Sequence, residues 1–327
     1  MKELYLGEAG SIELREIVLP KETKANEVRV RTIYGGICGS DIRVWKGLIG
    51  HAKYPIQAGH EVVGEVVGAG AGAEEWIGKR VTAFPNTYCG LCEFCAQGKT
   101  NICENKTCFG VNLPGFFAEE FVVDQKYVVE IPADLSSEKG VLIEPLAVAV
   151  HAVRRAGIEP GQNVAVVGCG PEGLLAITIA VYLGAEVTAI ELNPVKDELI
   201  KSLGVKEILR PGETDGRQFD VVFEAAGVKA ATEQAVELTK SGGKTILIGF
   251  TDRAEFQIVP IVRGEKSILG TIIYTKADFA TAIRYLQDAN FKVDPVVSKA
   301  FPLEQYKDAY EMAASGKYGK IVLDFQK

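Results

Sequence analysis

Residues 163–273 alternate between short apolar runs and segments of helical period, and this pattern constrains the fold more than any other feature. Six runs have strand character: NVAVVG, EVTAIE, EILR, DVVFEAAG, KTILIG and SILGTII. Between them lie three helical segments, PEGLLAITIAVYLG, VKDELIKSLG and KAATEQAVELTKSGG, the last of which closes on a glycine pair. The alternation predicts six parallel strands in a doubly wound α/β sheet of the Rossmann type. The third and fourth runs are so close together that no helix is expected between them.

The first predicted strand is followed by three glycines at a characteristic spacing. In NVAVVGCGPEG, Gly168, Gly170 and Gly173 form the pattern G-x-G-x-x-G between a strand and a helix. Such glycines allow a tight turn, a close approach of the backbone to a pyrophosphate, and packing of helix on strand. The pattern predicts a dinucleotide-binding site. The alternative is a glycine turn in an α/β sheet that binds no nucleotide.

The second predicted strand ends at Glu191, 18 residues after Gly173. A carboxylate at this position accepts hydrogen bonds from both ribose hydroxyls and repels a 2′-phosphate. No arginine occurs in the segment ELNPVKDEL that follows, where Lys196 is the nearest cation. We therefore predict NAD rather than NADP as the dinucleotide.

The N-terminal part of the chain has a different hydrophobic pattern. Residues 1–140 contain short β-branched runs separated by glycine and proline, which predict an all-β unit of barrel or sandwich type. The runs are EVRVRTI, EVVGEVVG, RVTAF, AEEFVV and YVVEIP. Two more helical stretches, at about 277–289 and 303–315, precede a final strand in GKIVLDF. A chain of 327 residues exceeds the usual size of one core, so two domains are expected.

Composition and charge narrow the class of protein. With 47% hydrophobic and 24% charged residues, the sequence is typical of a globular protein. Its net charge of −7 disfavours nucleic acid as a partner, because a phosphate backbone attracts clustered lysine and arginine. No apolar run approaches the roughly 18 residues that span a bilayer, and the opening MKELYLGEAG carries charges where a signal peptide has its apolar core. These features predict a cytoplasmic protein with no membrane partner.

Four of the seven cysteines lie close together in CGLCEFCAQGKTNIC. Cys89, Cys92, Cys95 and Cys103 follow the spacing C-x2-C-x2-C-x7-C, which fits a zinc ion held by four thiolates. In a reducing cytosol clustered cysteines are more often metal ligands than disulfides, and an odd total argues against full pairing. The alternatives are a chance cluster of loop cysteines and an oxidised CxxC pair. A closed site has no position for a substrate, so we predict a structural zinc in a lobe at about residues 86–107.

Three other segments contain residues that could form a second metal site. GGICGSD contains Cys38, QAGHEVVG contains His60 followed by Glu61, and VLIEPLAVAVHAV contains Glu144 within an apolar stretch. A buried carboxylate needs a metal, a proton or a partner. Together with an open position, cysteine, histidine and glutamate are typical of a catalytic zinc site. Taken singly, Cys38 could be a small core residue, His60 a satisfied turn histidine and Glu144 a helix N-terminal acid.

The set of motifs resembles the zinc-dependent medium-chain alcohol and polyol dehydrogenases, and most closely their sorbitol and threonine dehydrogenase branch. The resemblance covers nearly the whole chain, through GICGSD, GHEVVGEVV, the four-cysteine lobe, EPLAVAVHA, the glycine pattern and GGKTILIGF. It implies a GroES-like β-barrel catalytic domain at 1–144, a Rossmann NAD-binding domain at 145–273 and a C-terminal return to the first domain at 274–327. It also implies two zinc ions per chain, one catalytic and one structural, in a cytoplasmic homodimer or homotetramer acting on a small-molecule substrate.

By this resemblance the second metal site is catalytic. Cys38, His60 and Glu61 would hold the zinc. Glu144 would lie at a further, exchangeable position, and which of the two carboxylates is the third ligand stays open. The zinc would act as a Lewis acid on the substrate oxygen while a hydride passes to the nicotinamide.

The resemblance assigns roles to four more residues. Ser40 would be the first proton-relay group beside the substrate oxygen, and Asp41 would orient the histidine ligand. Ile248 and Gly249, in GGKTILIGF, would contact the dinucleotide.

The sequence departs from the family pattern at Arg43. After CGSD many relatives carry a histidine at this position, which ends the proton relay. Arginine is not an ordinary base, so the relay would end at water or at His51. Arg43 could hold a substrate carboxylate or a cofactor phosphate, or it could face solvent.

The sequence therefore predicts an NAD-dependent enzyme that transfers a hydride between a secondary alcohol and the nicotinamide. A polyol, a sugar or a sugar acid is the expected substrate, with threonine or a simple secondary alcohol as the alternative. Two other classes stay open. A zinc-free reductase of the same superfamily would lack the Cys38, His60 and Glu61 set, and a protein without enzymatic activity would bind NAD beside a zinc loop.

Overall fold

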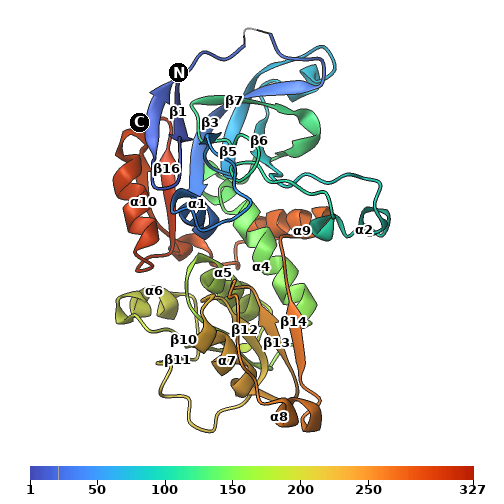
Figure 1. Ribbon diagram of the computed structural model, residues 1–327, viewed down its shortest axis with the longest axis vertical. Coiled ribbons are helices and arrows are strands. Elements are labelled where there is room, and N and C mark those ends of the chain that lie inside the picture. The colour runs from blue at the N-terminus through green and yellow to red at the C-terminus, as the bar shows by residue number, and fades with distance from the viewer. Residues whose placement is uncertain (21) are drawn as a thin grey trace. The chain divides into compact units, whose positions relative to one another are not determined.

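The computed structural model describes residues 1–20 and 22–327 (Figure 1). The chain forms two compact units. Unit 1 comprises Met1–Glu144, Val297–Ser315 and Lys320–Lys327, so the end of the chain belongs to the same unit as its beginning. Unit 2 comprises Pro145–Val296 and the short segment Gly316–Gly319. None of the helices in the described ranges has the length and apolar character that crossing a bilayer requires.

The described residues of unit 1 form two sheets. The larger has seven strands: β3 (Glu27–Ile37), β5 (Glu61–Ala69), β6 (Arg80–Ala83), β7 (Glu120–Asp124), β8 (Val128–Glu130), β15 (Val297–Pro302) and β16 (Lys320–Asp324). They follow the order β15, β16, β3, β5, β6, β8, and β7 pairs with the first part of β3. The smaller sheet has β2 (Glu13–Glu16), β1 (Lys2–Leu6) and β4 (Ile56–Gln57) in that order.

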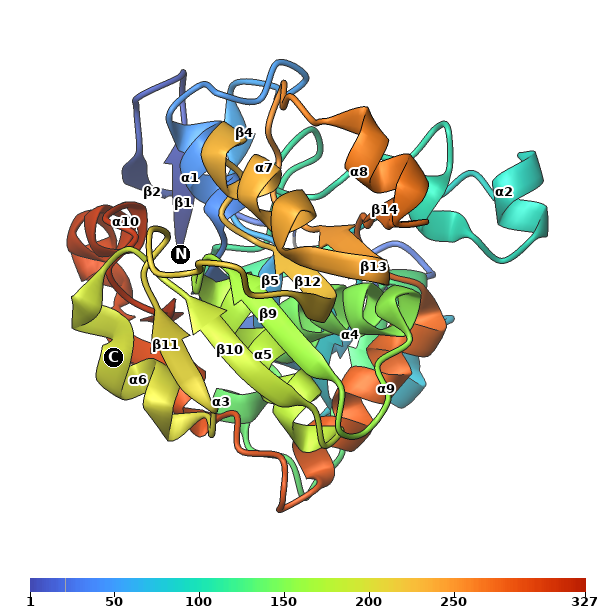
Figure 2. The same cartoon turned by 90° about the horizontal axis from the view of Figure 1, so that it is seen from below.

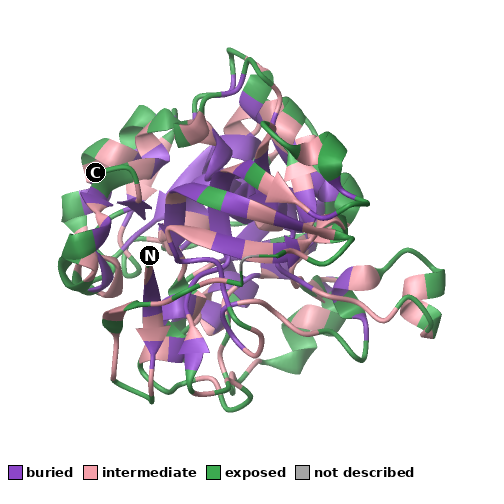
Figure 3. Ribbon diagram, turned by 90° about the horizontal axis from the view of Figure 1, so that it is seen from above, coloured by how far each residue is buried: buried purple, intermediate pink, exposed green. Residues whose placement is uncertain are grey.

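Alternation of side chains explains the strands of the larger sheet. In β3, Val28 and Val30 are buried, and they join a cluster with Val62, Val66 and Phe121 from neighbouring strands. In Figure 3 the buried residues gather on the strands, and the helices carry exposed residues on their outer turns. The five runs predicted from the sequence are β3, β5, β6, β7 and β8, so these strands are confirmed, although the first unit also contains short helices and is not purely β. The smaller sheet and β15 were not predicted.

Short helices complete unit 1: α1 (Gly39–Trp45), α2 (Glu93–Ala96), α3 (Ser137–Gly140) and α10 (Tyr306–Ala314). The last of these packs on β16 and contacts α1. At that contact the rings of Trp45 and Tyr310 meet edge to face, with centroids 5.9 Å apart. The C-terminal return is therefore anchored on the segment that follows β3. A longer helix, α4 (Ile143–Ala156), begins in unit 1 and continues in unit 2.

Unit 2 is a parallel sheet of six strands in the order β11, β10, β9, β12, β13, β14 (Figure 2). Their bounds are β9 (Asn163–Val167), β10 (Glu186–Ile190), β11 (Glu207–Leu209), β12 (Phe219–Glu224), β13 (Thr239–Leu247) and β14 (Ser267–Gly270). The helices are α5 (Pro171–Tyr182), α6 (Asp197–Ser202), α7 (Lys229–Leu238), α8 (Ile258–Arg263) and α9 (Lys276–Gln287). Helix α5 packs against β9 and β10, whereas α7 packs against β12 and β13. The predicted doubly wound sheet is confirmed.

The sequence placed the end of one helix wrongly. The segment KAATEQAVELTKSGG was expected to be helical as far as its glycines, but α7 ends at Leu238 and β13 begins at Thr239. Thr239 pairs with Phe219 of β12, and this strand pairing, with the β-branched side chain, favours an extended backbone there. Between β11 and β12 the described residues form no helix, as predicted.

Candidate active site

Cys38, His60 and Glu61 form a group of potential metal ligands whose ligand atoms all lie within 4.8 Å of one another. Cys38 caps the N-terminus of α1, directly after β3, and Glu61 begins β5. Strands β3 and β5 are antiparallel neighbours with Gly36 opposite Glu61, so the end of one strand meets the start of the other. The pairing of these two strands is what brings the three side chains together.

His60 is buried and is held through one ring nitrogen. Its Nδ1 lies 3.1 Å from Oδ1 of Asp41, whose Oδ2 accepts a 2.8 Å hydrogen bond from the backbone N–H of Cys38. Burial works against a charged imidazole, yet the charge of Asp41 outweighs it and raises the pKa of His60 well above its usual value. The other nitrogen, Nε2, lies 3.4 Å from Oγ of Ser40. Because Asp41 engages Nδ1, Nε2 is the atom available to a metal.

Glu61 is fully buried, and its two carboxylate oxygens have different surroundings. Oε1 accepts a 2.6 Å hydrogen bond from Nζ of Lys320, which is equally buried, whereas Oε2 has no hydrogen-bond partner. Burial raises the pKa of Glu61 to about 7, and the charge of Lys320 opposes that shift. A Cβ on Gly36 would collide with Oε2, so a side chain opposite this carboxylate would displace it.

The group fits a zinc ion. A thiolate, an imidazole and a carboxylate are three ligands of the kind found in catalytic zinc sites, which keep a further position open. Oε2 of Glu61 is the atom that a metal would satisfy, because a buried carboxylate oxygen without a partner is costly. Sequence reasoning did not find Lys320, which lies 259 residues from Glu61, and no local motif marks it.

Glu144 is buried but does not belong to this ligand group. It is the second residue of α4, and its charge contributes to the raised pKa of Glu61. Cys108 lies in the same electrostatic environment. Burial raises the pKa of its thiol to about 12, and the charges of His60 and Glu144 act on it as well. The structure thus brings three of the four predicted ligands together, with Glu144 in electrostatic range, and adds a thiol that the sequence did not single out.

The four cysteines of the lobe form a second group with ligand atoms within 4.8 Å of one another. Their Sγ atoms are 3.5 Å apart for Cys89 and Cys103, 3.9 Å for Cys92 and Cys103, and 4.0 Å for Cys89 and Cys95. Four sulfurs at about 2.3 Å from one zinc ion stand about 3.8 Å apart in a tetrahedron. The N–H groups of Leu91 and Cys92 lower the pKa of Cys89 to about 6, which favours the thiolate that a metal requires. These thiols are free rather than paired as disulfides.

The glycine pattern lies between β9 and α5. Gly168 has a φ of +89°, and a Cβ there would also press on Ala226. A Cβ on Gly173 would collide with the carbonyl oxygen of Gly168, so this glycine lets the helix approach the strand. Gly170, the N-cap of α5, has open space where its Cβ would be, so there is room beside the helix N-terminus. The geometry is that of a pyrophosphate cradle.

Glu191 follows β10 and is buried. Its carboxylate accepts hydrogen bonds from the backbone N–H of Cys169 at 2.9 Å and of Asn193 at 2.8 Å. Nζ of Lys196 also donates to it at 2.8 Å, and this lysine is buried too. The acidic position is therefore held beside the glycine loop, and a lysine that the sequence marked only as the nearest cation neutralises part of its charge.

Ile248 and Gly249 follow β13 and are tied to the neighbouring strand. Their N–H groups donate to the carbonyl oxygen of Glu224, the last residue of β12, at 2.8 and 3.0 Å. The buried Oε1 of Glu224 accepts from the N–H groups of Ala226 and Gly227, at 2.9 and 2.7 Å. Glu224 thereby fixes the loops after two strands at the carboxyl edge of the sheet. The sequence did not single it out, because its role depends on two separate loops.

Arg43 is exposed on α1, three residues after Ser40, and residues at this spacing lie on the same side of a helix. Within the described ranges its guanidinium makes no ion pair. His51 is exposed as well. Neither residue is held in a single role by the surrounding structure.

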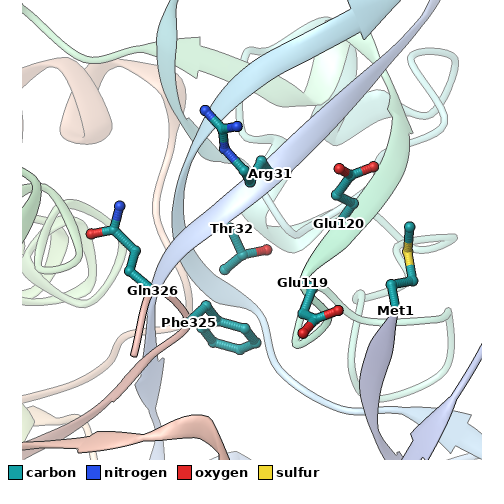
Figure 4. Close-up of a pocket in the computed structure, with 7 residues that line it drawn as sticks. All are labelled: Met1, Arg31, Thr32, Glu119, Glu120, Phe325 and Gln326. Atoms are coloured by element: carbon teal, nitrogen blue, oxygen red, sulfur yellow. The ribbon is translucent and has the colours of Figure 1, made fainter.

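A cavity of 340 Å³ in unit 1 lies apart from these groups (Figure 4). It is lined by Met1, Arg31, Thr32, Glu119, Glu120, Phe325 and Gln326. Its lining contains no cysteine or histidine and none of the site residues predicted from the sequence.

Two family profiles match the chain. The profile described as Alcohol dehydrogenase GroES-like domain matches residues 24–133, and that described as Zinc-binding dehydrogenase matches residues 171–288. The chain belongs to the zinc-dependent medium-chain alcohol and polyol dehydrogenases. This dehydrogenase is an oxidoreductase acting on CH–OH donors, and the family predicted from the sequence is confirmed.

Named relatives cover most of the dehydrogenase. The 2-dehydro-3-deoxy-L-galactonate 5-dehydrogenase of Pseudoalteromonas atlantica is 32% identical over 300 residues, covering 88% of each chain. The sorbitol dehydrogenase of Bacillus subtilis is 30% identical over 335 residues, covering 97% of this chain and 94% of its own. A crystal structure of a zinc-binding dehydrogenase from Sinorhizobium meliloti, bound to NADP, superposes with a TM-score of 0.92 at 29% identity, covering 99% and 98%.

Proposed function

We propose that this dehydrogenase oxidises a secondary alcohol of polyol, sugar or sugar-acid type, with NAD as the hydride acceptor. The observation that carries the proposal is the group of Cys38, His60 and Glu61, with an unpartnered carboxylate oxygen, in a chain of the zinc-dependent family. A zinc-free reductase of the same superfamily would lack this set. Its presence favours zinc-dependent chemistry.

Five residues would prepare the reaction. Cys38, His60 and Glu61 would hold the metal, which supplies Lewis acidity at the substrate oxygen when it is bound. Asp41 holds Nδ1 of the imidazole and so keeps Nε2 directed toward the metal position. The hydroxyl of Ser40, 3.4 Å from Nε2, is placed to accept a proton from a substrate hydroxyl bound there. From Ser40 the proton would pass to water or to the exposed imidazole of His51.

The substrate class is supported by two relatives and one arginine. By name, one relative is a sugar-acid dehydrogenase and the other a sorbitol dehydrogenase. We propose that Arg43, exposed on the Ser40 side of α1, pairs with a substrate carboxylate and so favours the acid over the neutral polyol. Threonine and simple secondary alcohols are the alternative substrates.

For the cofactor, the proposal is NAD bound over Gly168, Gly170 and Gly173, with Glu191 on the ribose. The buried carboxylate of Glu191, beside the glycine loop, supports this preference because it would repel a 2′-phosphate. Lys196 offsets part of that charge, so the preference is expected to be moderate rather than absolute.

Domain roles and assembly follow the same proposal. Residues 1–144 would serve as the catalytic domain with its zinc lobe at about 86–107, residues 145–273 as the NAD-binding domain, and residues 274–327 as the return to the first. The dehydrogenase would work as a cytoplasmic homodimer or homotetramer. Light scattering of the purified protein tests the assembly, and a monomeric mass at working concentration would contradict it.

The function is tested with a substrate panel and a metal analysis. The panel contains a polyol, a sugar, a sugar acid, threonine and a simple secondary alcohol, each with NAD and with NADP, and the absorbance of the reduced cofactor is followed. Turnover of a polyol, sugar or sugar acid with two zinc ions per chain is the expected result. One zinc ion with turnover would favour a reductase whose reaction uses no zinc, because the remaining ion would be that of the cysteine lobe. One zinc ion without turnover would favour a non-enzymatic NAD-binding protein.

A further inference from the structure

Lys320 is a buried cation for which the reaction described above has no use. Its side chain and that of Glu61 both have 0% exposed surface, and Nζ lies 2.6 Å from Oε1. Taking two charges out of water costs several kcal/mol per ion, and the attraction between them often no more than offsets that cost. Stability alone therefore gives a poor account of the pair, and its position beside the metal group suggests another.

The pair is formed across the central strand of unit 1. Lys320 begins β16 and Glu61 begins β5, and both strands pair antiparallel with β3 on its two edges. Gly36 of β3 lies between them, opposite Val322 on one edge and Glu61 on the other. A side chain at Gly36 would collide with Oε2 of Glu61. The glycine thus provides the space in which the carboxylate is held from one side by the lysine.

The ion pair divides the carboxylate into two unlike oxygens. Oε1 is engaged by Lys320, whereas Oε2 is buried, has no partner and belongs to the residue grouped with Cys38 and His60. We propose that Lys320 is a positioning residue of the metal site: its ammonium holds Oε1 of Glu61 and so presents Oε2 to the metal. This proposal rests on the proposed function, since it takes that group as the catalytic metal site.

Charge balance is consistent with this role. A Zn²⁺ ion with the Cys38 thiolate and the carboxylates of Glu61 and Glu144 nearby has two positive charges against three negative ones. The buried carboxylate of Asp41 behind His60 adds a fourth negative charge, and the ammonium of Lys320 reduces the excess of negative charge from two to one. The carboxylates of Glu61 and Glu144 can then both stay ionised near one metal ion, without Glu144 displacing Glu61 from it.

Cobalt(II) absorption tests the assignment without turnover. Co²⁺ takes the same nitrogen, oxygen and sulfur ligands as zinc, and its visible bands change with the number and kind of ligands. The contribution of the four-thiolate lobe is subtracted with the spectrum of Cys38→Ser. We expect Lys320→Met to change the remaining bands as much as Glu61→Gln does, because both changes release Oε2 from its position. Glu144→Gln should leave them as in the wild type.

A double variant shows whether Lys320 acts through Glu61. On the Glu61→Gln background, Lys320→Met should cause no further spectral change. Val322→Ala, a buried neutral position on the same face of β16, is the matched control and should keep the wild-type bands. If Lys320→Met alone does not fold, Lys320→Gln, whose uncharged amide fills part of the same space, takes its place and should change the bands in the same direction.

Three results would overturn the proposal: wild-type bands in Lys320→Met, a further change in the double variant, or bands that respond to Glu144→Gln. A failure of the proposed function is seen separately, in the wild-type protein, as missing turnover and a single zinc ion. Wild-type turnover with unchanged bands in Lys320→Met would therefore remove the positioning role alone.

Discussion

The two thiolate-containing groups of unit 1 are built in opposite ways. The lobe takes all its ligands from residues 89–103, and three of its four cysteines are half-buried. The other group takes Cys38 from the end of β3, His60 and Glu61 from the start of β5, and the lysine behind them from β16. A closed site assembled from one segment needs little from the rest of the fold. An open site assembled from three strands holds its geometry only while the whole sheet is intact.

The largest expected effect tests the assembled site, by which we mean the group of Cys38, His60 and Glu61. Cys38→Ser or His60→Ala should lower kcat on the order of a thousandfold, because Lewis-acid stabilisation of the transition state is worth several kcal/mol. NAD affinity, measured by fluorescence titration, and the circular dichroism spectrum should stay close to wild type. Turnover within a factor of about ten of wild type would place the chemistry elsewhere.

The next effect tests the four-cysteine lobe, whose ligands all come from one segment of the chain. Cys95→Ser should reduce the zinc content from two ions to one and lower the free energy of unfolding by about 3 kcal/mol, which corresponds to a Tm lower by roughly 6–12 °C. The value of kcat well below the new Tm should be nearly unchanged. Gln97→Ala, an exposed non-ligand change in the same lobe, is the control. A variant that keeps both zinc ions and its Tm would contradict the structural assignment.

A smaller effect concerns the rim of the assembled site. Arg43→Ala should lower kcat/KM for a sugar acid by roughly thirtyfold, or about 2 kcal/mol, as expected for a lost hydrogen bond to a charged group. The matching neutral polyol should lose little, and KM for NAD should not change. Lys46→Ala removes another exposed cation just after α1 and serves as the control. Equal losses for both substrates, or a loss confined to NAD affinity, would exclude the carboxylate role.

The smallest effect belongs to the dinucleotide loop, another site built from neighbouring segments. Glu191→Ala should reduce the ratio of kcat/KM for NAD over NADP by about tenfold, since the carboxylate no longer repels the 2′-phosphate. Lys196 already neutralises part of that charge, which limits the size of the change. Glu198→Ala, an exposed carboxylate on α6, should leave the ratio unchanged. A wild-type preference for NADP would contradict the assignment.

The same contrast decides what could be predicted from the sequence. The four cysteines and the three glycines can be identified from their spacing, because the geometry of each motif is set within one short segment. Cys38, His60 and Glu61 were found as separate motifs, and only the pairing of β3 with β5 joins them. The family resemblance grouped these three residues in advance, whereas composition and hydrophobic periodicity could not.

Other features required the tertiary structure. Lys320 looks like an ordinary lysine at the start of a strand, and only the return of β16 to β3 buries it against Glu61. Glu224 owes its role to two loops that the sequence keeps apart. The early end of α7 at Leu238 was missed because β13 competes for the following residues, and strand pairing outweighs the local preference for helix.

The C-terminal position of β16 has a consequence for how the protein is made. A ribosome that adds about 5–20 residues per second reaches Lys320 roughly 9–35 s after it has passed Glu144. Until then the end of β3 that leads into Cys38 lacks its neighbour on one edge, since residues 34–37 pair there with β16. The cysteine lobe has all its ligands once residue 103 has been made, so it can take up its metal on the nascent chain. The site beside Lys320 is completed only after residues 320–324 of β16 have been made.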